Sequence, residues 1–141
     1  MSIYLDASVI IPTFIPELHS ALVDRFLDRH LDPYVVSDFA AGEVASGFSR
    51  LLREGKLGRE AADRKLANFD GWLLTDCSHT TVGNADIRLA MVFVRRFDLK
   101  LRMPDALHLA VCRKLSLQLV TLDRRMADAG RALDIDVIIP D

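Results

Sequence analysis

Short apolar runs alternate with longer amphipathic stretches along the whole chain. Such alternation predicts βα units around a parallel sheet, with helices on its faces. The expected strands are 3–6, 34–37, 77–82, 117–122 and 137–139. The expected helices are 17–31, 38–54, 59–73, 84–97 and 104–115, with a short helix near Pro12 and a helical or irregular segment over 124–133. The fold class is therefore α/β, with a mostly parallel central sheet.

The length and charge of the chain restrict its function. Its 141 residues fit one domain, 1–141, and half of them are hydrophobic, so that a real core can form. The formal net charge is -2 and the sequence pI is about 6.1, which is not typical of a protein that holds duplex DNA by charge alone. A nuclease remains possible, because bound cations turn an acidic cleft into a phosphate site.

The N-terminus has neither the basic start nor the long apolar run of a signal peptide. No stretch approaches the apolar length that spans a bilayer. We therefore expect a cytoplasmic protein with no membrane partner.

Four acids lie where βα architecture places active sites. Asp6 and Asp123 follow apolar runs, Asp105 follows Pro104 at the start of a helix, and Glu43 lies in the first turns of another helix. Ligands of open parallel sheets bind outside the carboxyl ends of the strands. The four side chains are therefore expected to meet at one edge.

Four carboxylates in one cleft repel each other unless a cation compensates their charge. Oxygen ligands select hard ions, so Mg²⁺ or Mn²⁺ is the expected cofactor. Such ions bind phosphates, activate water and stabilise a leaving oxygen, which favours phosphodiester hydrolysis.

A purely structural interpretation of each acid stays open. Most of the 20 acidic residues are expected to be solvated surface charges. Asp105 alone suits the dipole of its helix, and Asp123 alone suits a turn. The metal hypothesis depends on three acids each adjoining an apolar segment at an element end.

Four segments together resemble the motifs of PIN domains, in the same order. The segments are YLDASVI (4–10), SDFAAGEV (37–44), MPDALHLA (103–110) and LVTLD (119–123). The match covers nearly the whole chain, and the small single-domain form most resembles the VapC toxins of toxin–antitoxin pairs.

This resemblance implies a Mg²⁺- or Mn²⁺-dependent endoribonuclease with a single PIN-like domain. It also implies a homodimer, inhibition by a VapB-type antitoxin, and an RNA substrate such as transfer RNA or ribosomal RNA. Carried over to this chain, it makes Asp6, Glu43, Asp105 and Asp123 the metal-binding and catalytic acids.

The same resemblance suggests individual roles. Asp6 and Asp105 would contact the metal directly, and Glu43 would do so directly or through water and help to deprotonate the attacking water. Asp123 would bind a second ion or orient other ligands. The supporting hydroxyls would be those of Ser8 and Thr121.

Other polar residues allow two interpretations. His108 lies one helical turn beyond Asp105 and is interpreted as a packed, hydrogen-bonded residue, although it can also face the cleft. Arg124 and Arg125 adjoin Asp123 and are candidates for contact with RNA phosphates, the alternative being solvated charges. The cluster around Arg50 and Arg53 has the same two interpretations.

Of three rival functions, the residues disfavour the first and leave the other two open. A haloacid-dehalogenase-like phosphatase needs a second aspartate two residues after the first, where this chain has Ser8. A non-catalytic, receiver-like interaction module would use the acids structurally. A housekeeping RNA-processing PIN nuclease would keep the chemistry without the antitoxin.

Overall fold

The computed structural model describes residues 2–141, and its centre is a parallel sheet with the strand order β3-β2-β1-β4-β5. Every neighbouring pair of strands runs in parallel, which confirms the expected α/β class. The strands are β1 (Ile3–Leu5), β2 (Tyr34–Ser37), β3 (Cys77–Thr80), β4 (Gln118–Val120) and β5 (Val137–Ile138). The helices are α1 (Ala7–Phe14), α2 (Ser20–Arg29), α3 (Asp38–Arg53), α4 (Arg59–Asp76), α5 (Asn84–Val94), α6 (Met103–Leu115) and α7 (Arg124–Ala132), with a 3₁₀ turn, η1 (Phe97–Leu99).

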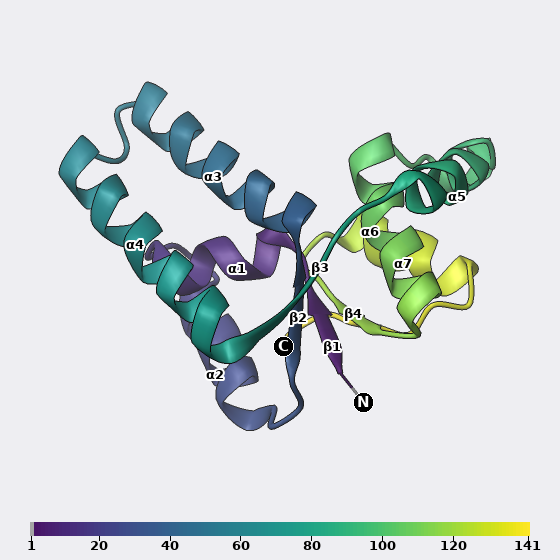
Figure 1. Cartoon of the computed structure of the whole chain (residues 1–141), viewed down its shortest axis with the longest axis horizontal. Coiled ribbons are helices and arrows are strands. Elements are labelled where there is room, and N and C mark those ends of the chain that lie inside the picture. Colours follow the sequence, from purple (N-terminus) through teal and green to yellow (C-terminus); the bar gives the residue numbers. More distant parts are fainter. Residues whose placement is uncertain (1) are drawn as a thin grey trace.

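The helices form two layers, one on each face of the sheet. Helices α1 to α4 cover one face and α5 to α7 cover the other (Figure 1). Successive side chains of a strand point to opposite faces. Ile3 and Leu5 therefore pack in the core under α1 to α4, whereas Tyr4, between them, packs in the core under α5 to α7.

Some elements differ from the sequence-based prediction, and one, the 124–133 segment, adopts the helical form of the two that the prediction left open. Helix α1 begins directly after Asp6 and contains Pro12 near its end, where a turn with a later helix was expected. Strand β4 ends at Val120, so Asp123 does not end the strand but caps α7, accepting a hydrogen bond from Met126 N at 3.1 Å. The 124–133 segment is a regular helix because this cap satisfies an amide of its first turn.

The predicted helix over 84–97 is shorter in the structure. Helix α5 ends at Val94, and the chain then makes the η1 turn, which closes with Lys100 in the left-handed region at φ 54°. None of the helices in the described part of the chain combines the length and apolar character that a bilayer crossing requires.

Gly130 marks the closest approach of α7 to its neighbours. A Cβ at this position would lie 2.8 Å from Val137 Cγ2 and 3.1 Å from Leu109 Cδ2, whereas a Cβ at Gly71 on α4 would meet nothing within 4 Å. Only the absence of a side chain at Gly130 allows α6, α7 and β5 to pack at this distance.

We predict that Gly130→Ala lowers the free energy of unfolding by about 1–3 kcal/mol, because overpacking displaces buried side chains. The matched change Gly71→Ala should raise it by about 0.4–1 kcal/mol, because the unfolded chain loses conformational freedom. Urea unfolding of the two variants measures both effects. Equal changes in stability would show that the contact at Gly130 is not tight.

Candidate active site

Asp6 lies at the carboxyl edge of the sheet, immediately after the central strand β1. The residue is 4% exposed, and its carboxylate accepts hydrogen bonds from Ser8 Oγ at 2.6 Å and from Thr121 Oγ1 at 2.7 Å. Burial raises the pKa of Asp6, and the two hydroxyl groups, together with nearby His108, offset part of that rise. The acid is therefore held in one orientation by donors from two different strand ends.

The same two hydroxyls also hold the chain after β4. Ser8 Oγ accepts a hydrogen bond from Leu122 N at 2.9 Å, and Thr121 Oγ1 accepts one from Asp123 N at 3.0 Å. The predicted supporting residues, Ser8 and Thr121, thus connect Asp6 to the segment that carries Asp123. The supporting role that the resemblance implies for them stays a prediction, and these contacts are its structural basis.

Glu43 reaches the site from α3. Ser37 caps this helix by accepting a hydrogen bond from Ala40 N at 3.0 Å, as expected for a serine before a first turn. The Glu43 side chain is 33% exposed, and its Oε1 lies 2.5 Å from His108 Nε2. The glutamate therefore has one oxygen engaged with the protein while part of the side chain remains accessible.

His108 is more closely involved than the sequence suggested. The prediction of a packed, hydrogen-bonded residue is confirmed, since His108 is 2% exposed, yet its partner is one of the four acids. Its spacing from Asp105, one turn along the same helix, was the only signal for this contact. No local pattern identifies a partner 65 residues away.

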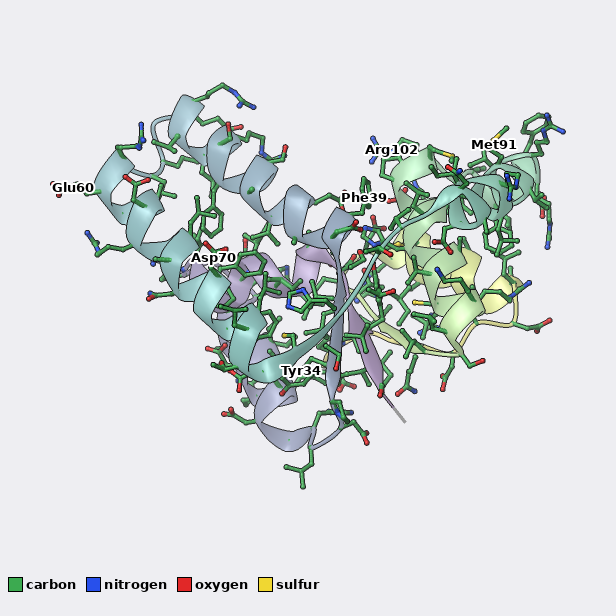
Figure 2. All side chains as sticks on the ribbon, in the orientation of Figure 1. Tyr34, Phe39, Glu60, Asp70, Met91 and Arg102 are labelled. Atoms are coloured by element: carbon green, nitrogen blue, oxygen red, sulfur yellow. The ribbon has the colours of Figure 1, made fainter. Side chains whose placement is uncertain are left out.

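Asp105 lies in the first turn of α6, after Pro104, and its side chain is 14% exposed. Burial raises the pKa of Asp105, and the negative charges of Asp123 and Glu43 raise it further, against the lowering effects of Arg102 and His108. Charge effects of this kind require proximity, so Asp105 lies near both Asp123 and Glu43. Figure 2 shows Phe39 and Arg102, from the starts of α3 and α6, at this same end of the molecule.

The donor set fits a hard divalent cation. The acids are oxygen ligands, and the negative charges of Asp123 and Glu43 add to the effect of burial in raising the pKa of Asp105. Within residues 2–141, no group of three or more histidine, cysteine, aspartate or glutamate side chains is arranged so that it could hold a metal ion. Mg²⁺ commonly uses one or two carboxylates and keeps several waters, so an open set of acids suits it.

The arginines predicted to contact RNA lie in two places. Arg124 and Arg125 are exposed at the start of α7, and Arg125 lines a hollow with Asp98 and Asp128, to which none of the four acids contributes. By contrast, a cavity of about 260 Å³ between α1 and α3 is lined by Glu43 together with Arg50 and Arg53. Arg50 and Arg53 thus share a cavity with Glu43, whereas Arg124 and Arg125 follow Asp123 in the chain, and the hollow that Arg125 lines includes none of the four acids.

Comparison with known proteins gives a family and a set of similar folds. The PIN domain family matches residues 3–132. The chain is 34% identical to Ribonuclease VapC46 of Mycobacterium tuberculosis over 142 aligned residues, which cover 99% of this chain and 98% of that protein.

Two solved structures illustrate the likeness in fold. VapC20 of Mycobacterium tuberculosis, a toxin that cleaves the sarcin–ricin loop, has a TM-score of 0.73 at 21% identity, covering 91% of this chain and 95% of its own. VapBC2 of Rickettsia felis, bound to a promoter DNA fragment, has a TM-score of 0.73 at 12% identity, covering 100% of both chains.

The raised pKa of Asp105 predicts a stability change with a definite sign. The Asp105 carboxyl binds its proton more tightly in the folded state than in the unfolded chain. The free energy of unfolding therefore falls as the pH rises from the ordinary pKa of an aspartate through the raised pKa of the folded state. Asp105→Asn should therefore raise the free energy of unfolding at pH 7 in EDTA. The gain should vanish at pH 3, where both states are protonated.

Urea unfolding at the two pH values measures this effect. Asp70→Asn is the matched control, because Asp70 is an exposed residue of α4 (Figure 2) and should have little effect at either pH. A loss of stability in Asp105→Asn at pH 7 would contradict the electrostatic account of the site.

Proposed function

The chain belongs to the PIN-domain family and, within it, to the VapC ribonucleases, and on this premise we propose that it hydrolyses phosphodiester bonds in RNA with divalent metal ions held by its acids. The observation that carries the proposal is the gathering of carboxylates at one edge of the sheet, where Asp105 is affected by both Glu43 and Asp123. The unit that acts is the whole chain, 1–141, as a single PIN domain.

The proposed metal-binding roles are the ones that the resemblance to PIN domains implies. Asp6 and Asp105 would hold Mg²⁺ or Mn²⁺ directly, and Glu43 would do so directly or through water, with Asp123 holding a second ion or orienting the others. When bound, such an ion supplies positive charge that binds the substrate phosphate and stabilises the leaving oxygen.

The protein's own groups perform the remaining tasks. Ser8 and Thr121 hold the Asp6 carboxylate in place, so that no reorientation is needed when the substrate arrives. Glu43 Oε2, which has no hydrogen-bond partner among residues 2–141, accepts the proton of the attacking water. The reaction uses no covalent nucleophile of the protein.

RNA would be held by arginines beside the acids. Arg50 and Arg53 share a cavity with Glu43. Their guanidinium groups would bind the phosphates on either side of the cleaved bond. Arg124 and Arg125 would contact a more distant part of the strand from the start of α7. Transfer RNA and ribosomal RNA both suit this arrangement, and the reaction would take place in the cytoplasm.

The proposed partners are a VapB-type antitoxin and a second copy of the chain. A toxin of this class must be neutralised in its own cell, and the fold is shared with VapBC and other toxin–antitoxin complexes. An exposed apolar face of α5 supports a homodimer, since Ile87, Met91 and Val92 are 41%, 46% and 60% exposed (Figure 2 labels Met91).

Two alternatives remain to be separated from this proposal. A housekeeping RNA-processing PIN nuclease would keep the metal site but would need no antitoxin. A receiver-like interaction module would bind one metal ion weakly and cleave no RNA.

We predict that purified protein cleaves RNA in Mg²⁺ or Mn²⁺ and that EDTA stops the reaction. Asp6→Asn and Asp105→Asn should each lower kcat by at least about a hundredfold, because each removes a charged ligand of the proposed ion. Gel analysis of end-labelled RNA measures the cleavage, with Asp70→Asn as a folded control. Normal cleavage by both site variants would contradict the metal-site assignment.

We also predict that expression of the chain alone arrests bacterial growth. Co-expression of the product of a short neighbouring upstream reading frame should restore growth, and Asp105→Asn should not be toxic. Colony counts with and without the neighbouring gene measure the effect. Active nuclease without toxicity would favour the housekeeping alternative.

A further inference from the structure

A line of buried hydrogen bonds runs from the start of α3 to Glu43 through three residues. Ser37 Oγ lies 2.7 Å from Tyr4 Oη, Tyr4 Oη lies 2.6 Å from His108 Nδ1, and His108 Nε2 lies 2.5 Å from Glu43 Oε1. Ser37, Tyr4 and His108 are 1%, 0% and 2% exposed, so water does not compete for these bonds. We call these three residues the relay.

The direction of the relay follows from its ends. At one end, Ser37 Oγ accepts a hydrogen bond from Ala40 N, and residues 2–141 offer its hydroxyl no acceptor except Tyr4. Ser37 therefore donates to Tyr4, and the Tyr4 hydroxyl, which has a single proton, donates to His108 Nδ1. This leaves Nε2 as the protonated nitrogen of His108, which donates to Glu43.

The reverse direction leaves a buried group unsatisfied. If His108 Nδ1 donated to Tyr4 and Tyr4 donated to Ser37, the Ser37 proton would have no acceptor within residues 2–141. An unsatisfied buried polar group costs about 1–3 kcal/mol. Packing also holds the His108 ring in place. The centroid of the ring lies 5.6 Å from that of Tyr4 and 5.3 Å from that of Phe39.

We propose that Ser37, Tyr4 and His108 are positioning residues whose one-way relay holds Glu43 by Oε1 and leaves Oε2 free for a divalent ion or its water. This inference rests on the proposed function and adds residues that the acids alone do not reveal. Groups that hydrogen-bond a metal ligand from behind orient it, and their loss typically weakens metal binding or activity about 10- to 100-fold.

The first test is independent of catalysis. Long-range ¹H–¹⁵N spectra of metal-free protein at pH 7.5 report which nitrogen of His108 carries the proton. The chain has four histidines, and the signal that is missing in His108→Gln identifies the one from His108. We expect the Nε2-protonated form, and Tyr4→Phe should move the Nδ1 signal toward that of an imine nitrogen without a donor. A proton on Nδ1 in the unmodified protein, or an unchanged Nδ1 signal in Tyr4→Phe, would overturn the proposal.

Tyr34→Phe is the matched control for this change. Tyr34 is the first residue of β2, at the other end of the sheet (Figure 2), and its hydroxyl donates to Leu27 O at 2.9 Å. Loss of its hydroxyl should leave the His108 signals, Mn²⁺ affinity and cleavage unchanged.

The second test measures Mn²⁺ affinity by calorimetry and cleavage kinetics on the same variants. Tyr4→Phe and His108→Leu should weaken Mn²⁺ binding and lower kcat about 10- to 100-fold with little change in KM. His108→Gln, which keeps an N–H donor toward Glu43, should restore most of both. Tyr4→Phe keeps its ring, so it tests the relay even if His108→Leu does not fold.

The outcomes separate the two proposals. Folded Tyr4→Phe with unchanged Mn²⁺ affinity and kcat would show that the relay is only structural. If the unmodified protein cleaves no RNA, the proposed function fails, whereas the spectra and the Mn²⁺ affinities still decide for or against the relay.

Discussion

Strand β1 pairs in parallel with β2 on one side and with β4 on the other, and the site depends on this pairing. Parallel strands end at the same edge, so residues that follow β1 and β4 meet although they are more than 100 positions apart. Asp6 N–H extends the pairing by donating to Val120 O, and Thr121 Oγ1 then reaches the Asp6 carboxylate. Burying Asp6 is tolerated because two hydroxyl donors meet it there.

The acids at this edge of the sheet lie in two kinds of environment. Asp6 is buried and fully engaged with hydroxyl groups, whereas Asp105 is half-buried and lies near other negative charges. In both cases burial raises the pKa, because the charged form of each carboxyl loses contact with water in the folded state. Buried carboxyls of this kind lower the stability of the folded state, and such groups are common at functional sites.

Glu43 connects this edge to the opposite helical layer. It projects from α3, in the layer of α1 to α4, and bonds to His108 of α6, in the other layer. Tyr4 makes the link possible because alternation along β1 directs its side chain toward α6 while Ile3 and Leu5 point away. The geometry of the site is therefore coupled to the packing of both layers on the sheet.

The sequence by itself determined the order of strands and helices, the parallel sheet, and the acids at the ends of elements, because hydrophobic periodicity and capping are properties of short segments. The tertiary structure alone decided that β4 stops at Val120 with Asp123 as a helix cap, and that Arg50 and Arg53 share a cavity with Glu43. It alone also paired His108 with Glu43 and Tyr4, at separations of 65 and 104 residues. Such contacts depend on how whole layers pack, and no local pattern encodes that packing.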